Sequence, residues 1–359
     1  MKKIIALAFA GAAVLSMSAQ QDCKSMFEQA KKLDDLFNKE KPTQTDPNKV
    51  ISVEAAQALI DAYTIYNQVI ECEAVPNAKG KVENKLTKKA EASLLKHAQD
   101  GDYYKAAMTF YNAEKNYPEA SKAFFLSGLN SQKYATAPDT IAAEDFFNAG
   151  TLAFGNDFNE AAAAFEASRK AGSNKPEVYL YNIYSLQQLA MKDTTLNFHE
   201  QIFDIAKQGV GKFGATNDQL YKMYIQHFLD NDDLQGAFDE VNKAMAKEPN
   251  SATLYGLRGY LNVEKNEVEP AIADYSKAGE LSDNFEYVRD YANTINRLGK
   301  FIIGQLPMSP TADQKTMVLG IFQEAKKLAE KAQTLPEADG SVASILDDIN
   351  YNIENAEKL

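Results

Sequence analysis

Apolar residues recur at helical spacing along most of the chain, and the stretch 101–118 (GDYYKAAMTFYNAEKNYP) shows the pattern most clearly. Ala106, Phe110 and Ala113 follow one another at steps of four and three, which places them on one face of a helix. A glycine–aspartate step precedes this helix, and Pro118 closes the stretch. The spacing predicts a helix whose alternating small and large residues pack against a neighbouring helix.

The same order of small, large and small residues returns in stretches that begin at Asn156, Asp232 and Asn266. Ala237 and Ala271 occupy corresponding positions in the last two copies and are 34 residues apart. A second segment of apolar periodicity precedes each copy, so one unit contains two helices. A fixed period of this length with two helices in each unit predicts a helical solenoid.

These units resemble the tetratricopeptide repeat (TPR). The resemblance rests on the 34-residue period, on a small residue in the first helix such as Ala149 or Gly259, and on the small–large–small run in the second helix. It covers about residues 81–300, although Ile225 stands where another copy has its small residue. It implies a right-handed, all-α superhelix of helical hairpins whose first helices line a concave surface where partner peptides lie. It also implies a scaffold rather than a particular activity.

The predicted organisation has four parts. They are a signal peptide at 1–20, an N-terminal helical hairpin at 21–80, a TPR solenoid at 81–300, and C-terminal helices with a cap at 301–359. The stretches 133–140 and 191–200 interrupt the period as insertions. Outside the solenoid, apolar periodicity predicts helices at 22–39, 53–72, 313–335 and 342–359.

The N-terminus has the pattern of a secretory signal peptide. Two lysines precede an apolar run at 4–15, small residues follow, and cleavage after residue 18, 19 or 20 fits the sequence. The run is too short to cross a bilayer core of ~30 Å as a helix, and no later segment reaches ~20 apolar residues. Because Gln-Gln-Asp precedes Cys23, the chain lacks a lipid-anchor signal there. We expect an exported protein in the periplasm, free or associated with the outer membrane.

The two cysteines, Cys23 and Cys72, are expected to form a disulfide. The predicted helices 22–39 and 53–72 are joined by a short proline-containing turn, so they should pack antiparallel. The start of the first helix then lies beside the end of the second, where the two cysteines stand. The alternative is a pair of free, buried thiols.

The charge balance argues against two classes of partner. The chain has 38 basic and 50 acidic residues and a net charge of −12, so a nucleic acid or an anionic membrane surface would repel it. With 18 tyrosines, 19 phenylalanines and no tryptophan, most large buried side chains should be tyrosine, phenylalanine or leucine.

No residue pattern for catalysis, metal binding or cofactor binding emerges. His97, His199 and His227 have no partner at metal-ligand spacing, and no zinc, phosphate-binding or nucleophile-elbow motif occurs. The adjacent residues His199 and Glu200 are by themselves only weak evidence for an acid–base catalytic pair. We therefore expect a protein that is not an enzyme and that holds no cofactor and no metal.

The TPR resemblance places a set of residues on the concave surface. These groove candidates are Phe146, Phe147, Phe154, Tyr181, Tyr184, Gln188, Lys222, Met223, Gln226, Tyr260 and Glu264. Burial between helices is the competing interpretation for each aromatic residue. Because the slots around Lys222 and Gln226 are not basic, an extended or helical apolar peptide fits better than an acidic tail. We predict a protein-interaction scaffold of unknown oligomeric state; the alternative is a carbohydrate-binding component of an outer-membrane uptake system.

Two tripeptides in the interruptions match an O-glycosylation pattern of exported bacterial proteins. They are Asp139-Thr140-Ile141 and Asp193-Thr194-Thr195, which makes Thr140 and Thr194 candidate acceptors. At the first tripeptide, a helix N-cap at Asp139 or Thr140 is the competing interpretation.

Overall fold

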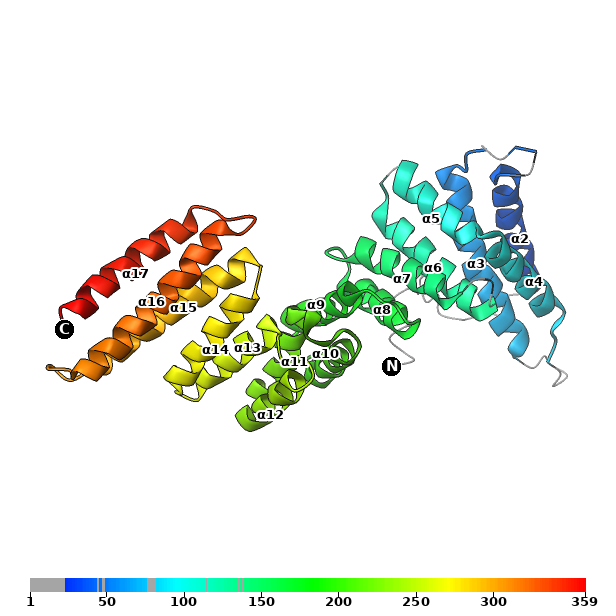
Figure 1. Cartoon of the computed structure of the whole chain (residues 1–359). Coiled ribbons are helices and arrows are strands. Elements are labelled where there is room, and N and C mark those ends of the chain that lie inside the picture. Colours follow the sequence, from blue (N-terminus) through cyan, green and yellow to red (C-terminus); the bar gives the residue numbers. More distant parts are fainter. Residues whose placement is uncertain are drawn as a thin grey trace. The chain divides into compact units, whose positions relative to one another are not determined.

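The structure is a computed structural model that describes residues 23–359 except 44, 47–48, 76–81, 114, 135 and 137. The expected signal peptide at 1–20 lies outside the described residues. The described residues form sixteen α-helices and one short 3-10 helix, with no strand among them (Figure 1). The predicted all-α class is therefore confirmed. None of the described helices combines the length and the apolarity needed to span a membrane.

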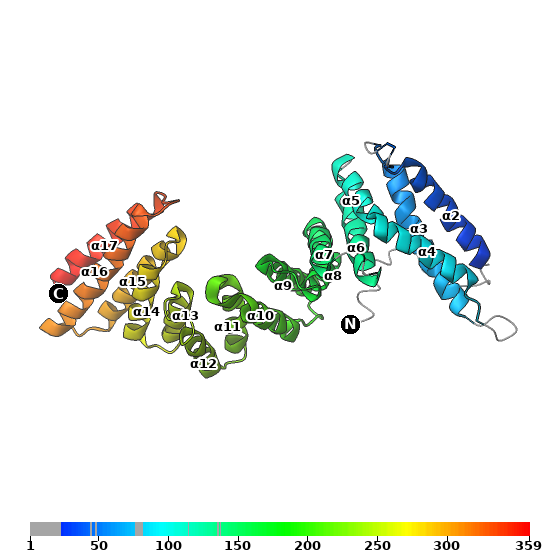
Figure 2. The same ribbon diagram turned by 45° about the vertical axis from the view of Figure 1, so that its right-hand side comes forward.

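The chain divides into two compact units, Met1–Ile205 and Ala206–Leu359, with the boundary inside α10 (His199–Phe213). Within each unit, consecutive helices pack against one another, as the two views in Figures 1 and 2 show. The first unit contains α2 (Cys23–Glu40), α3 (Val53–Ala74), α4 (Lys85–Asp100), α5 (Asp102–Ala113), α6 (Tyr117–Tyr134), α7 (Asp139–Ala153), α8 (Phe158–Lys170) and α9 (Pro176–Lys192). The second contains η1 (Gly214–Thr216), α11 (Asp218–Asp230), α12 (Leu234–Met245), α13 (Ala252–Glu264), α14 (Val268–Leu281), α15 (Phe285–Gln305), α16 (Ala312–Thr334) and α17 (Ser341–Glu357).

The predicted packing of small residues against aromatic ones is present in both units. A Cβ atom added to Gly150 of α7 would lie 2.7 Å from the ring of Phe165 in α8. A Cβ atom added to Gly259 of α13 would lie 3.0 Å from the ring of Tyr275 in α14. In each hairpin the missing side chain lets the second helix place a ring against the backbone of the first.

The stretch 101–118 forms α5 and the start of α6. Ala106 and Phe110 are fully buried, as expected, but Ala113 is the exposed last residue of α5. Pro118 lies in the first turn of α6 instead of ending α5, and proline is tolerated there because that N–H would have no helical partner. The small–large face of the helix was thus predicted correctly, and its C-terminal end was not.

Cys23 and Cys72 form a disulfide between the start of α2 and the end of α3, with their Cα atoms 5.9 Å apart. These helices pack against each other as an antiparallel pair, with Tyr66 and Phe27 among the buried residues of their shared core. The predicted pairing is present in the structure, and the alternative of two free thiols is not.

The C-terminal helices continue the hairpin arrangement. α15 and α16 pack together around Ile295 and Ile321, and α17 covers α16 with Val342 and Ile349. The predicted helices 313–335 and 342–359 correspond to α16 and α17 within two residues at each end. Thr311 begins α16 with a capping box, in which its hydroxyl accepts the Gln314 N–H and the Gln314 side chain accepts the Thr311 N–H.

Candidate functional site

The second unit contains a pocket of about 400 Å³ between α11, α13 and α15, with Tyr275 of α14 behind it. These three are the first helices of successive hairpins. The wall is partly apolar and partly polar. Its lining residues are Asp218, Lys222, Ile225, Gln226, Leu229, Thr253, Gly256, Leu257, Tyr260, Tyr275, Tyr287, Asp290, Tyr291 and Thr294.

The repeat period aligns these residues in rows across the three helices. Lys222, Gly256 and Asp290 are spaced by 34 residues and form one row. Gln226, Tyr260 and Thr294 form a second row with the same spacing. Each row takes one residue from α11, one from α13 and one from α15, so the pocket is a direct consequence of the period.

Gly256 makes room for the pocket's aromatic wall. A Cβ atom added there would lie 2.2 Å from the hydroxyl oxygen of Tyr291, so only glycine leaves space for this ring. The Tyr291 ring stacks on Tyr275, with ring centres 5.6 Å apart and planes inclined by 29°. The stacked pair fixes the position of the Tyr291 hydroxyl at the pocket surface.

An ion pair with an aromatic ring forms the polar corner of the pocket. The Lys222 ammonium lies 3.1 Å from Asp218 and 4.7 Å from the centre of the Tyr287 ring. The Tyr287 hydroxyl donates a hydrogen bond to the same carboxylate of Asp218. Asp290, the α15 member of the Lys222–Gly256–Asp290 row, is 60% exposed and accepts hydrogen bonds from Arg289.

The pocket tyrosines stay protonated at neutral pH. Burial, together with the Asp218 and Asp290 carboxylates, raises the pKa of Tyr291 to about 12. Burial and the Asp218 carboxylate raise the pKa of Tyr287, and burial with the neighbouring Glu264 raises that of Tyr260. The site therefore presents aromatic faces, hydroxyl donors and carboxylate acceptors, a set suited to binding.

Three predicted groove residues, Lys222, Gln226 and Tyr260, line this pocket. Met223 is a half-buried neighbour on α11, and Glu264 is exposed at the end of α13. The structure thus brings Lys222, Gln226 and Tyr260 together at the pocket, and it leaves Met223 and Glu264 outside the pocket lining.

Several of the predicted groove residues of the first unit belong to a separate cluster of aromatic rings. Phe154 and Tyr181 are half-buried, with ring centres 5.2 Å apart, and Tyr181 also contacts the fully buried Phe165 at 5.6 Å. Phe147 is half-buried beneath the Lys175 ammonium, 4.2 Å from its ring centre. These rings form an aromatic cluster around Phe165, in which Phe147, Phe154 and Tyr181 are each partly exposed.

Phe146 has no exposed surface, because its ring packs on Phe125 and against the backbone of Gly128. It belongs to the core, and we leave it out of the groove. Tyr184 and Gln188 are half-buried on α9.

Asp218, Tyr287, Asp290 and Tyr291 are pocket residues that the sequence analysis did not name as groove candidates. A signal for two of them was present. Adding 34 to Lys222 twice gives Asp290, so projecting the inward slots through one more copy would have found it. Adding 34 twice to Met223 gives Tyr291 in the same way.

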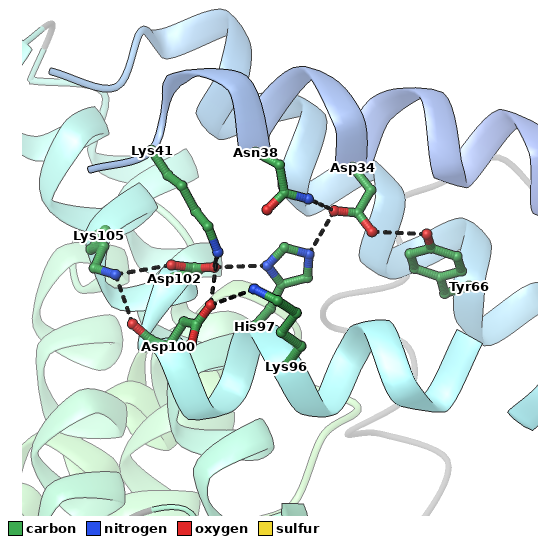
Figure 3. Close-up of polar contacts among 9 residues, drawn as sticks. All are labelled: Asp34, Asn38, Lys41, Tyr66, Lys96, His97, Asp100, Asp102 and Lys105. Atoms are coloured by element: carbon green, nitrogen blue, oxygen red, sulfur yellow. Dashed lines mark hydrogen bonds and ion pairs between the residues drawn. The ribbon is translucent and has the colours of Figure 1, made fainter. Parts of the chain in front are cut away.

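A buried polar cluster links four helices of the first unit (Figure 3). The Nδ1 atom of His97 lies 2.8 Å from Asp102, and its Nε2 atom lies 2.9 Å from Asp34. The Tyr66 hydroxyl donates to Asp34 at 3.0 Å, and Lys41 pairs with Asp102 at 2.8 Å. Asn38 also donates to Asp34. The cluster joins α2, α3, α4 and α5 and is closed to solvent around the imidazole.

The carboxylates on both sides favour the doubly protonated form of His97. Burial opposes this charge, but the hydrogen bonds to Asp102 and Asp34 outweigh it and raise the pKa of His97. The same contacts lower the pKa of Asp34 and of Asp102 against the effect of burial. No group of described side chains has the arrangement of a metal site. The hydrogen bonds and ion pairs of the cluster form an internal ionic connection between helices.

Thr140 and Thr194 are both exposed. Thr140 lies in the first turn of α7, whose N-cap is Pro138 without a side-chain cap bond. The predicted N-cap at Asp139 or Thr140 is therefore wrong. Thr194 lies in the turn after α9, where the Asp193 carboxylate accepts hydrogen bonds from the backbone and the hydroxyl of Thr195.

No protein-family model and no curated protein sequence matches this chain. Among solved structures, the C-terminal part of a TPR repeat-containing protein from Cytophaga hutchinsonii is 15% identical, with a TM-score of 0.42, over 82% of this chain and 99% of that one. The human IFIT1 dimer with m7Gppp-AAAA is 14% identical, with a TM-score of 0.38, over 94% and 76% of the two chains. The TPR2AB-domain:pHSP90-complex of yeast Sti1 is 12% identical, with a TM-score of 0.26, over 92% and 99%. The similarity to TPR-repeat proteins is distant, and it assigns neither a family nor a function to this chain.

Proposed function

We propose that this protein is a non-enzymatic interaction scaffold that binds a peptide segment of a partner protein along the face formed by α11, α13 and α15. The observation that carries the proposal is the pocket itself. Apart from Tyr275, its residues come from the first helices of three successive hairpins, at positions that correspond in the repeat. They leave about 400 Å³ open beside the exposed ring of Tyr260. An extended segment crossing these helices could place one side chain in the pocket and its backbone beside Gln226 and Thr294.

The chemistry of the pocket supports binding rather than turnover. Its tyrosines are held protonated, and Asp218 is already engaged by Lys222 and the Tyr287 hydroxyl. No histidine or cysteine lines it. A scaffold role needs only the aromatic faces and polar groups already described.

The proposed location is the bacterial cell envelope, most simply the periplasm. The N-terminal sequence supports export, and the Cys23–Cys72 disulfide fits an oxidising compartment. Exposure of Thr140 and Thr194 is compatible with O-glycans there. The intact mass of the exported protein tests this modification, since an unshifted mass excludes it.

A carbohydrate ligand is the second candidate for the same pocket. Tyr260 is 41% exposed, and carboxylates and an amide lie beside it, so the pocket could stack a sugar ring and bind its hydroxyls. The absence of tryptophan and of a lipid-anchor signal favours the peptide.

Selection of peptides from a random library tests the proposed function. Peptides selected on the purified protein are expected to bind saturably and to lose binding in Thr253→Trp, which fills the pocket with a larger side chain at a half-exposed wall position. Tyr351→Trp, at an exposed position on α17, is the matched control and should bind normally. Peptides that bind both variants equally would contradict the pocket assignment. Saturable, Thr253→Trp-sensitive binding on a glycan array, without peptide binding, would favour the carbohydrate.

A further inference from the structure

We propose that the pocket between α11, α13 and α15 receives a lysine or arginine side chain of the partner segment. The inference rests on the proposed function, because it names the side chain that a bound peptide places in the pocket. Its basis is the charge and the shape of the pocket wall.

The wall carries more negative than positive charge. Its charged residues are Asp218, Lys222 and Asp290. The Lys222 ammonium is paired with Asp218 inside the wall, so these two charges largely cancel. Asp290, at the α15 end of the same row as Lys222 and Gly256, is the remaining charge, and its 60% exposure leaves carboxylate oxygen available for a further donor besides Arg289.

The corner at Lys222 shows how this wall accommodates a cation. One ammonium group sits both over the Tyr287 ring and against the Asp218 carboxylate. The pair Tyr291 and Asp290 offers the same two elements, an aromatic ring and a carboxylate, on the adjoining part of the wall. A cation in this second place would be attracted by the ring face and by the carboxylate together.

The electrostatic surroundings of the tyrosines agree with this geometry. The charged groups that raise the pKa of Tyr291 are Asp218 and Asp290, and Glu264 does the same for Tyr260. A negative field at these hydroxyls favours a positive ligand group and disfavours a carboxylate.

The apolar part of the wall matches the stem of a long basic side chain. Ile225, Leu229 and Leu257 contribute aliphatic surface, and the tyrosine rings extend it. Lysine and arginine bury their methylene stems against such surface while the charged head reaches a polar edge. An aliphatic residue would use the stem surface alone and leave Asp290 without a new partner.

Three synthetic peptides test the inference. Each is a seven-residue alternation of serine and alanine whose central residue is lysine, norleucine or glutamate. Norleucine keeps the four-carbon stem of lysine and lacks its charge. Titration into protein with ¹³C-labelled tyrosine rings, followed by NMR at Tyr260 and Tyr291, measures even millimolar affinity at the pocket itself.

The lysine peptide is expected to bind about tenfold more tightly than the norleucine peptide, with the glutamate peptide weakest. In Asp290→Asn the preference for lysine over norleucine should fall about fivefold. Asp347→Asn, the same charge change at an exposed position on α17, is the matched control and should behave as the wild type.

Three results would overturn the inference. They are norleucine binding as tightly as lysine, no saturable shift with the lysine peptide, and a lysine preference that Asp290→Asn leaves intact. If library-selected peptides still bind in a Thr253→Trp-sensitive way, the proposed function survives such a result. If no peptide shows that sensitivity, the proposed function fails and the inference fails with it.

Discussion

The imidazole Nδ1 of His97 lies 2.8 Å from the carboxylate of Asp102, and both side chains are almost completely buried. The second carboxylate, Asp34, stands 2.9 Å from Nε2 on the other side of the ring. The contact with Asp102 joins the consecutive helices α4 and α5, and the contact with Asp34 joins α4 to α2, which is not its neighbour in sequence. The cluster therefore ties the N-terminal hairpin of α2 and α3 to α4 and α5.

Replacing His97 with glutamine is expected to lower the free energy of unfolding of the first unit by about 3 kcal/mol, because two buried carboxylates lose their shared cation. Urea denaturation followed by circular dichroism measures the change. His199→Gln, at an exposed position, is the control and should remain within about 0.5 kcal/mol of the wild type. Equal free energies of unfolding for the two variants would show that the cluster does not stabilise the fold.

The same cluster predicts a defined pH dependence. The pKa of His97 is raised from 6.5, so its contribution is fully present below pH 6.5 and is lost as the pH rises through the higher folded value. The pKa values of Asp34 and Asp102 are lowered from 3.8, so their contribution is present above pH 3.8 and is lost as the pH falls through the lower folded values. The stability difference between wild type and His97→Gln should therefore be largest between pH 3.8 and 6.5.

Nitrogen NMR of the His97 ring checks this directly. Both ring nitrogens should carry protons at pH 6, and the pKa of the ring should lie above the ordinary histidine value of 6.5. A neutral ring at pH 6 would contradict the predicted charge state.

Breaking the Cys23–Cys72 disulfide is expected to destabilise the first unit by about 4 kcal/mol, since the bond closes a loop with a sequence separation of 49. The double variant Cys23→Ser/Cys72→Ser should unfold at a lower urea concentration, and a reducing agent should shift the wild type to match it. A wild type insensitive to reduction in partial denaturant would indicate that the bond does not form in the purified protein.

The repeat period predicted the helical hairpins because one physical rule, a small residue facing a ring, recurs in them. Gly150 with Phe165 and Gly259 with Tyr275 follow it. The same period would also have predicted Asp290 as a pocket residue, because it lies one repeat beyond the last copy from which groove candidates were taken. The Asp34–His97–Asp102 cluster has no such signal, because three non-periodic positions meet only after α2, α4 and α5 have packed.

Neighbouring residues on a helix show a second limit of pattern reasoning. Phe146 and Phe147 were both predicted to face the groove, yet the first is fully buried and the second is half-buried. They differ by about 100° around the helix axis, and the position of the adjacent helices decides which one is covered. Sequence periodicity gives the angle between the two side chains around the helix axis. Tertiary packing determines which of them faces the neighbouring helices and which faces solvent.

Replacing Gly256 with alanine should close the pocket from within. The new Cβ atom would meet the Tyr291 hydroxyl at 2.2 Å, so the ring must leave its stack on Tyr275. Overpacking of this kind costs about 1–3 kcal/mol, which outweighs the ~0.5–1 kcal/mol that alanine gains over glycine in a helix. Gly320→Ala on α16, where nothing lies within 4 Å of the added atom, is the control and should be stabilised by that smaller amount.

The double variant Gly256→Ala/Tyr291→Phe separates the steric effect from a general weakening of α13. Removing the hydroxyl takes away the contact at 2.2 Å and leaves the ring carbon Cζ at 2.9 Å, so a partial recovery of stability is expected. A double-mutant cycle on the free energy of unfolding should give a favourable coupling of about 1 kcal/mol between the two changes. Purely additive effects would mean that the two residues do not meet. Pocket-dependent peptide binding should be weakened in Gly256→Ala in either case, because the added methyl group occupies the floor between Lys222 and Asp290.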